Sequence, residues 1–189
     1  GTEVTTPETV KNFGMQVQYR ILPRCFGYYE ILGETIYAAE IEKICTSTNT
    51  LSFDDYVACR KLHFIIHLFY NDGFFSTLIK FIKSLNLSVF DWLKLIFDQE
   101  LFGNIKELFD SFLNDTKNEL YQDRNELYKL TQNQEIIDSY IQGDLGYNLL
   151  FVHKASALSN YIDDLMDLAK ESVLKLLEIN GYNTPEHKL

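Results

Sequence analysis

The strongest constraint in this sequence is a long stripe of apolar residues near its C-terminus. The residues recur at steps of three and four, which is the spacing of one face of an α-helix. The members of the stripe are Phe151, Ala155, Leu158, Ile162, Leu165, Ala169, Val173 and Leu176. A seam this regular is typical of a helix that packs against a second helix. The sequence therefore predicts a mainly helical protein.

A second apolar stripe precedes the seam and supplies the expected partner. It occupies the 105–142 segment, and the glycines of the 143–146 segment favour a tight turn after it. We therefore expect two long antiparallel helices joined as an αα-hairpin. Asp164 falls on the outer, solvated face of the second helix. The seam positions expected to face the 105–142 helix are Leu158, Ile162 and Leu165.

The N-terminal part of the chain has a different pattern. The 15–22 and 35–46 segments alternate polar and apolar residues, which indicates half-buried strands. Pro23 and Gly27 interrupt the first run, and a further apolar segment, 28–32, lies between the two. These segments predict a small antiparallel sheet of two or three strands. A sheet this small is marginal alone and has to pack on the helices.

Helix starts can be located from capping residues. The 5–8 segment, Thr-Thr-Pro-Glu, is a helix-start signature, and Ser52 and Ser88 are good N-caps for two later helices. The 62–70 segment in the first of these later helices is apolar almost all round. Such a helix is either buried in the core or covered by a partner. The sequence leaves these two alternatives open.

The predicted fold class is therefore mainly α. It is a helical bundle with a long C-terminal αα-hairpin and a small N-terminal antiparallel β-sheet. We assign residues 1–50 to a short helix plus the sheet, packed on the rest, and residues 51–189 to the bundle, as one structural unit. The chain has 189 residues and begins with Gly rather than Met. We expect it to be a fragment of a longer protein.

Charge and cysteine usage narrow the classes of partner. The formal net charge is −10, and no segment is a block of Lys and Arg, which argues against binding to nucleic acid or to an anionic membrane surface. No apolar run reaches the roughly 18 to 20 residues that span a bilayer. Cys25, Cys45 and Cys59 are few and widely spaced. They are expected to be reduced, buried thiols in a cytoplasmic protein. The homo-oligomeric state stays open.

A small set of side chains could form a functional surface. His63 and His67 are four residues apart, which places both imidazoles on one helix face at the spacing of two metal ligands. No HExxH motif accompanies them, so the alternative is a pair of structural or interfacial histidines. Arg24 and Arg60 are basic residues in apolar surroundings, where each either pairs with a carboxylate or contacts a partner. With Tyr70, these four residues form the candidate interface.

Motifs of catalysis are missing from the sequence. It has no G-x-S-x-G nucleophile elbow, no phosphate-binding glycine loop and no Cys–His signature. The sequence therefore predicts no catalytic, cofactor-binding or metal-binding residue in this chain.

Two sequence blocks resemble a known family. The first runs from Arg20-Ile21-Leu22-Pro23-Arg24-Cys25-Phe26-Gly27 through the 40–44 segment to the 48–56 segment, and the second is Gly146-Tyr147-Asn148-Leu149-Leu150-Phe151-Val152-His153-Lys154-Ala155. Together they resemble the C-terminal region of cobalamin-binding-domain radical S-adenosylmethionine proteins. That group includes Fe–S oxidoreductases and relatives of the anaerobic magnesium-protoporphyrin monomethyl ester cyclase.

The resemblance implies a function that the residue patterns alone do not indicate. Complete family members carry a Cys-x3-Cys-x2-Cys motif for a [4Fe–4S] cluster that binds S-adenosylmethionine, and some bind cobalamin. The three cysteines here are spaced too widely to form that motif. In complete family members that motif belongs to a partial TIM barrel, and the chain would then be a non-catalytic accessory domain that covers this barrel or shapes the access of substrate or partner, with the upstream domains of the same polypeptide as its partner. The alternatives are a free-standing helical protein–protein interaction domain and a metal or haem binder using His63 and His67.

Overall fold

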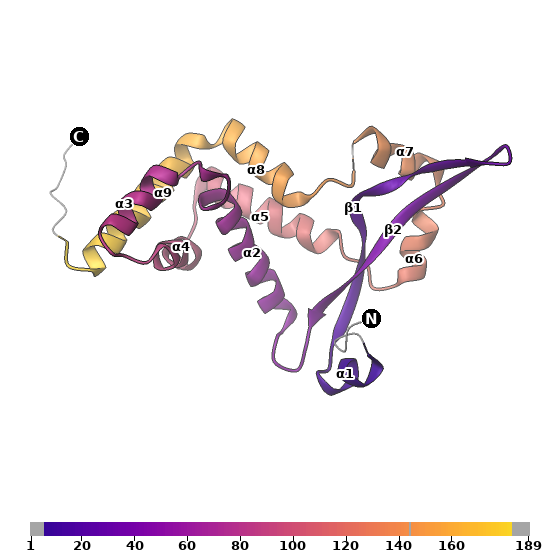
Figure 1. Cartoon of the computed structure of the whole chain (residues 1–189), viewed down its shortest axis with the longest axis horizontal. Coiled ribbons are helices and arrows are strands. Elements are labelled where there is room, and N and C mark those ends of the chain that lie inside the picture. The colour runs from indigo at the N-terminus through magenta and orange to yellow at the C-terminus, as the bar shows by residue number, and fades with distance from the viewer. Residues whose placement is uncertain (1–5, 144, 183–189) are drawn as a thin grey trace. The chain divides into compact units, whose positions relative to one another are not determined.

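The computed structural model describes residues 6–143 and 145–182. This part of the chain is mainly helical and contains one two-stranded antiparallel sheet, which confirms the predicted fold class (Figure 1). The chain divides into two compact units, Gly1–Ala58 with Leu113–Phe151 (unit 1) and Cys59–Phe112 with Val152–Leu189 (unit 2). The division differs from the predicted boundary at residue 50, because the sheet forms one unit with a later helical segment.

Each unit has its own set of elements. Unit 1 contains α1 (Pro7–Asn12), β1 (Gln16–Ile31), β2 (Glu34–Ser47), α6 (Arg124–Leu130) and α7 (Gln134–Gln142). Unit 2 contains the short 3-10 helix η2 (Asn71–Gly73), α3 (Ser76–Ser84), α4 (Val89–Asp98) and α9 (Ile162–Ile179). Three helices run across the division between the units: α2 (Phe53–Phe69), α5 (Gly103–Asn118) and α8 (Leu149–Asn160).

The sheet is a long two-stranded ribbon. The 28–32 segment, which the sequence left as a possible third strand, mostly continues β1. A bulge makes this possible: Ile21 pairs with Ile41 and Phe26 with Ala39, so four residues of β1 lie opposite one residue of β2. Pro23 falls in this bulge, where its missing N–H costs no ladder hydrogen bond.

Helices α6 and α7 pack along the ribbon within unit 1. The backbones of Tyr19 and Tyr121 exchange two hydrogen bonds, at 2.8 and 2.7 Å, and fix the segment before α6 to β1. The Arg20 guanidinium bridges Glu42 on β2, at 2.9 Å, and Glu119, at 2.5 Å. These contacts hold the part of the ribbon near residues 19–20 in place.

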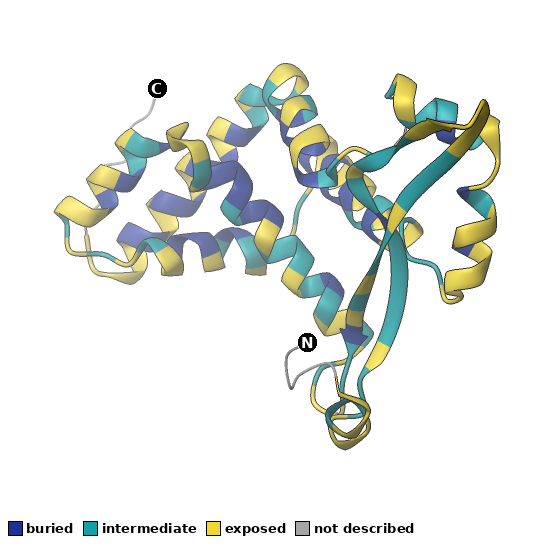
Figure 2. Ribbon diagram, turned by 45° about the vertical axis from the view of Figure 1, so that its right-hand side comes forward, coloured by how far each residue is buried: buried dark blue, intermediate teal, exposed yellow. Residues whose placement is uncertain are grey.

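Unit 2 contains an aromatic core. Figure 2 shows buried residues concentrated on its helices, whereas the ribbon of unit 1 is mostly half-buried or exposed. Phe64, Ile65, Leu68 and Phe69 of α2 are all 0% exposed. The apolar 62–70 segment therefore contributes core residues, which decides between the two alternatives that the sequence left open.

The predicted αα-hairpin is wrong in its details. The 105–142 segment is three helices, α5, α6 and α7, because Asp123 and Asn133 each accept a hydrogen bond from the backbone N–H two residues on and start a new helix. The seam helix is also interrupted, at Tyr161, between α8 and α9. The main partner of α9 is α4 rather than the 105–142 segment.

The seam positions are only partly core. Leu165 is 0% exposed, as expected, but Leu158 and Ile162 are half-buried. Asp164 is half-buried as well, and it accepts a 3.1 Å hydrogen bond from the side-chain amide of Asn104. The helical phase was therefore correct at Leu165, whereas Asp164 is less exposed than predicted.

Candidate functional site

Three of the five candidate interface residues share one face of α2, and a fourth follows the end of that helix. Arg60, His63 and His67 are spaced by three and four residues along the helix, and Tyr70 comes directly after its last residue, all within unit 2. His63 is exposed and Tyr70 is 44% exposed, but Arg60 is half-buried and His67 is only 7% exposed. Arg24 belongs to unit 1, where it lies in the bulge of β1. The structure therefore brings three of the residues onto one helix and places Tyr70 at its end, and of these four only His67 is largely buried.

The guanidinium of Arg60 packs on an aromatic ring. Its Cζ atom lies 5.6 Å from the centroid of Phe112, a distance typical of a cation–π contact. The same ring stacks on Phe64 at a centroid distance of 4.2 Å and meets His153 edge-on at 5.5 Å. Arg60 is thus part of the packing of unit 2.

A buried lysine organises the end of α2. The Nζ atom of Lys154 donates hydrogen bonds to the carbonyl oxygen of His67, at 2.9 Å, and to Oδ2 of Asp72, at 2.6 Å. Lys154 is 7% exposed, and its ammonium lowers the pKa of the Asp72 carboxyl below its usual value. A cation at the C-terminal end of a helix is favourable, because the last carbonyls carry partial negative charge. Sequence reasoning assigned no role to Lys154, since the contact joins distant segments.

The pKa of each histidine of the pair is lowered from its ordinary value. Burial is the main cause that lowers the pKa of both His63 and His67, with Arg60 contributing at His63 and Lys154 at His67. Within residues 6–143 and 145–182, no group of three or more His, Cys, Asp or Glu side chains is placed to hold a metal ion. Across the same residues, no helix is both long and apolar enough to cross a membrane.

The cysteines differ from the prediction. Cys45 and Cys59 are exposed, and Cys25 is half-buried, so the expectation of buried thiols is wrong. Cys45 lies in the two-stranded ribbon, where many side chains have no second layer over them. Its thiol donates a 3.4 Å hydrogen bond to the backbone oxygen of Ser47.

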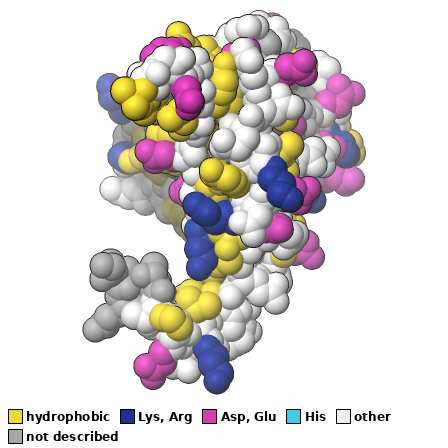
Figure 3. All heavy atoms as spheres, turned by 90° about the vertical axis from the view of Figure 1, so that its right-hand side faces the viewer, with side chains coloured by type: hydrophobic (Ala, Val, Ile, Leu, Met, Phe, Trp, Pro, Cys, Tyr) yellow, Lys and Arg dark blue, Asp and Glu magenta, His cyan; other side chains and the backbone are white. Residues whose placement is uncertain are grey.

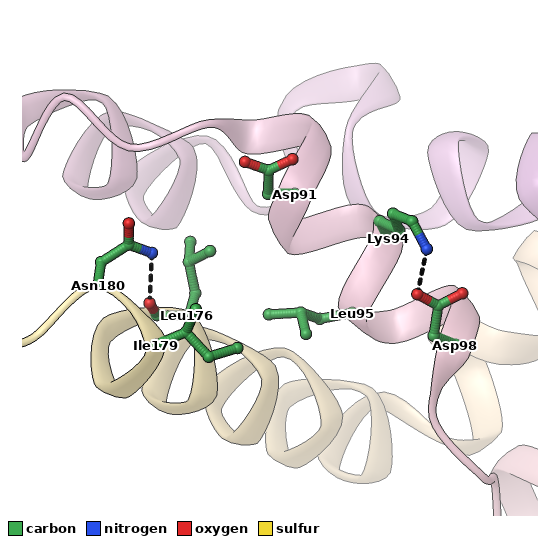
Figure 4. Close-up of a pocket in the computed structure, with 7 residues that line it drawn as sticks. All are labelled: Asp91, Lys94, Leu95, Asp98, Leu176, Ile179 and Asn180. Atoms are coloured by element: carbon green, nitrogen blue, oxygen red, sulfur yellow. Dashed lines mark hydrogen bonds and ion pairs between the residues drawn. The ribbon is translucent and has the colours of Figure 1, made fainter.

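A shallow groove lies between α4 and α9 in unit 2 (Figure 4). Its volume is about 250 Å³. Lys94 forms an ion pair with Asp98, and the side-chain amide of Asn180 donates a 2.8 Å hydrogen bond to the carbonyl oxygen of Leu176. The polar groups of this groove thus bond largely to one another. Its lining residues are Asp91, Lys94, Leu95, Asp98, Leu176, Ile179 and Asn180.

The end of the ribbon, residues 28–37, exposes several large apolar side chains, and we name it the hairpin tip. Figure 3 views the molecule from the right-hand side of Figure 1 and shows hydrophobic, acidic and basic side chains on that face. Leu32 is 102% exposed and Tyr29 is 62% exposed. The other large exposed apolar residues of the tip are Tyr28, Ile31 and Ile36.

The turn of the hairpin tip contains a residue that the turn itself does not favour. Leu32 and Gly33 connect the strands and have φ values of 54° and 85°. Two-residue turns with positive φ at both positions prefer Asn, Asp or Gly at the first, because a larger side chain is strained there. A bulky apolar side chain thus occupies a strained and fully exposed position.

The hairpin tip is also acidic. Glu30 and Glu34 flank the turn, and the hydroxyl of Thr35 donates a 2.8 Å hydrogen bond to Glu30. Burial, Asp138 and Glu30 together raise the pKa of Tyr37. No Lys or Arg occurs between Arg24 and Lys43.

No protein-family model, curated protein or solved structure matches this chain. The sequence interpretation did not single out the hairpin tip. The available signal was the 28–32 run, in which aromatic and apolar residues lead into Gly33 without strict alternation.

Proposed function

We propose that this chain is a non-catalytic docking domain whose hairpin tip inserts into an apolar pocket on a protein partner. The observation that carries the proposal is Leu32, fully exposed at a positive φ where Asn or Gly would suit the turn better. Backbone strain of this kind is typically retained at functional positions. Burying one such leucine side chain contributes about 1.5 to 3 kcal/mol.

The ribbon presents the tip in a defined place. Bonds from Arg20 to Glu42 and Glu119 fix the strands away from the turn, and the ring of Phe26 packs edge-on against Tyr140 at 5.0 Å. A pre-ordered element loses little conformational freedom on binding. Tyrosine is also enriched among the residues that dominate interface energies, and Tyr28 and Tyr29 stand beside the turn.

The negative charge of the hairpin tip indicates what kind of surface the partner presents. The hairpin tip carries Glu30 and Glu34 without a neighbouring cation in sequence, and the whole chain has a formal charge of −10. A second copy of the chain or an anionic membrane would repel it. The partner is therefore a protein surface with an apolar pocket and a rim of Lys or Arg.

A more specific form of the proposal follows the family resemblance. In that form the chain is the accessory domain of a cobalamin-type radical S-adenosylmethionine enzyme, and the docking surface is on the upstream domains of the same polypeptide. The resemblance itself is what supports this form, and the two sequence blocks that carry it meet where the backbone N–H of Arg24 donates to the carbonyl of Gly146, at 3.2 Å. Gly146 has a φ of 78°, and a Cβ atom there would lie 2.3 Å from the ring of Tyr140 and 2.5 Å from that of Phe26, so a larger residue would be strained. An open reading frame that begins near residue 1 would contradict this form and leave the docking function intact.

The Leu32→Asn substitution tests the docking function. Asn suits the turn, so the thermal midpoint should stay equal or rise, while the protein that co-purifies stoichiometrically with the wild type from the native cell should be lost. The control is Phe13→Asn, which removes a 58% exposed ring of unit 1 outside the tip. If the Leu32→Asn variant retains the partner, the tip is not the docking element.

A further inference from the structure

The groove between α4 and α9 contains a carboxylate that the described part of the chain leaves without a partner. Asp91 lines the groove and is exposed, and its carboxylate forms no ion pair or hydrogen bond with the residues that the structure describes. The other charged side chains of the lining, Lys94 and Asp98, are paired with each other. Two carboxylates and one ammonium give the lining a net negative charge. The groove therefore attracts a cation.

The start of α2 shows a different use of the same sequence pattern. Ser52 and Asp55 have the same spacing as Ser88 and Asp91. The Asp55 carboxylate accepts hydrogen bonds from the backbone N–H and the hydroxyl of Ser52, at 2.9 and 2.7 Å. At α4, the Ser88 hydroxyl accepts a 3.1 Å bond from the backbone N–H of Asp91, but the Asp91 carboxylate accepts none in return within the described residues. It lines the groove instead of capping the helix.

Apolar side chains form the floor of the groove. In Figure 4, Leu95 of α4 points toward Leu176 and Ile179 of α9, with Asp91 above Leu95 and Asp98 to its right. Leu176 is 2% exposed, whereas Ile179 is 64% exposed. Covering exposed apolar surface is favourable, and a bare inorganic ion covers very little of it. The floor therefore favours a cation that carries an apolar body.

The side-chain amide of Asn180 adds a second acceptor. Its nitrogen donates a 2.8 Å hydrogen bond to the carbonyl of Leu176, which fixes the orientation of the amide. Its oxygen accepts no hydrogen bond from the described residues, and Figure 4 shows it on the side of the groove where Asp91 lies. An ammonium or guanidinium group carries several N–H donors, so one cationic group can serve more than one acceptor.

We propose that this groove binds a small organic cation, in which an ammonium or guanidinium group is attached to a short apolar body. The cationic group bonds to the carboxylate of Asp91 and the amide oxygen of Asn180, while the apolar body packs on Leu95 and Ile179. The groove has a volume of about 250 Å³. Drug-sized sites have roughly 300 to 1,000 Å³, so this groove suits a single ring or a short alkyl chain. Its walls are two helices, whose backbone groups bond within each helix, so it offers no strand edge to an extended peptide.

Three probes of similar shape and different charge test the proposal. Near pH 7, phenethylamine is a cation, 2-phenylethanol is neutral and phenylacetate is an anion. In an NMR titration of the full chain at constant ionic strength, phenethylamine should shift the backbone amides of residues 91, 95, 98, 176, 179 and 180 saturably. It should bind at least tenfold more tightly than 2-phenylethanol, and phenylacetate should not saturate. The proposal is wrong if phenethylamine does not saturate these shifts by about 10 mM, or binds no more tightly than the alcohol.

Two further probes separate the alternative occupants. Ammonium chloride supplies the charge without an apolar body, and a blocked tripeptide with a central arginine supplies the cation on a peptide. Both should bind more weakly than phenethylamine. Ammonium that binds as tightly would show that charge alone is sensed, and a tripeptide that binds as tightly would show that the groove takes a protein side chain. Either result would overturn the proposal.

Variants assign the binding to Asp91. Asp91→Asn keeps the size of the side chain and removes its charge, so it should weaken phenethylamine at least tenfold and leave 2-phenylethanol unchanged. Ile179→Ser should weaken both probes. The matched control is Asp167→Asn, which removes the same charge from an exposed position of α9 outside the groove lining and should bind as the wild type does. Equal affinity in Asp91→Asn and wild type would contradict the assignment. The Leu32→Asn variant should bind phenethylamine normally, so this inference and the docking function fail separately.

Discussion

The indole Nε1 atom of Trp92 donates a 2.8 Å hydrogen bond to the hydroxyl of Ser172, and both residues are 0% exposed. The bond joins α4 to α9, the two helices that pack together in unit 2. The Ser172 hydroxyl in turn donates to the carbonyl of Leu168, at 2.8 Å. One buried serine therefore completes the polar requirements of the largest side chain in the core.

Ser172→Ala should destabilise the protein measurably. The substitution leaves the indole N–H of Trp92 buried without its acceptor, which typically costs about 1 to 3 kcal/mol. Urea denaturation gives the change in the free energy of unfolding. The control is Ser111→Ala, at an exposed position of α5, which should stay within about 0.5 kcal/mol of the wild type. Equal values for the two variants would mean that the Trp92 bond contributes nothing.

Leu165→Ala tests the seam of α9. The side chain is 0% exposed, so truncation should cost about 2 to 5 kcal/mol through lost transfer energy and the cavity left behind. Asp164→Ala should cost less, about 0.3 to 1 kcal/mol, because it removes a negative charge from the first turn of the helix and its bond to Asn104. Denaturation midpoints compare the two, and a larger loss for Asp164→Ala would contradict the packing described.

Acid should weaken the contact between Lys154 and Asp72. The pKa of Asp72 is lowered in the folded protein. Its contribution to the free energy of unfolding is therefore complete above the unfolded pKa of about 3.9, and is lost as the pH falls through the pKa of the folded state. Asp72→Asn should therefore be less stable than the wild type at pH 7. The difference should vanish at the acid end of a series of urea titrations. A difference that persists below pH 2 would mean that Asp72 acts through something other than its charge.

The histidines of α2 should affect the stability of the protein at a higher pH than Asp72 does. Burial lowers the pKa of His67 and of His63, so on acidification the unfolded chain takes up protons first. Stability is then complete above the unfolded pKa of about 6.5 and falls as pH drops below it. The His63→Gln and His67→Gln double variant should show a flatter pH dependence of the urea midpoint between pH 7.5 and 5.5. Identical slopes would contradict the lowered pKa values.

Metal analysis tests the hypothesis that His63 and His67 bind a metal ion. We expect no stoichiometric zinc or iron, because structural zinc sites use four protein ligands and catalytic ones three. One tightly held metal per chain that disappears in His63→Ala and His67→Ala together would show that this expectation is wrong.

Local signals in the sequence predicted the local structure well. Ser52 and Ser88 both accept the backbone N–H bond expected of an N-cap, because capping depends on only a few neighbouring residues. The 5–8 segment also begins a helix, with Thr6 as its N-cap. Asp123 and Asn133 are also N-cap residues. They were missed because the apolar stripe of the 105–142 segment was interpreted as one continuous helix. A stripe continues across a helix break when both helices face the same core.

The candidate site was harder to predict, because it depends on which apolar side chains the rest of the fold leaves exposed. The 28–32 run is as apolar as a core strand, and nothing in its sequence shows that Leu32 stays exposed. The Lys154 bonds to His67 and Asp72 also join segments far apart in the chain. Both features are tertiary, so single-sequence patterns do not contain them.

Photo-crosslinking from the hairpin tip tests the docking function most directly. A benzophenone amino acid in place of Leu32, in cells that express the chain at native level, should cross-link one protein at a surface rich in Lys and Arg. The same amino acid in place of Phe13 is the control, and the Glu30→Lys and Glu34→Lys pair should lower the yield from position 32 at least tenfold. The proposal is contradicted if position 32 cross-links no better than position 13, or only to lipid or to a second copy of the chain.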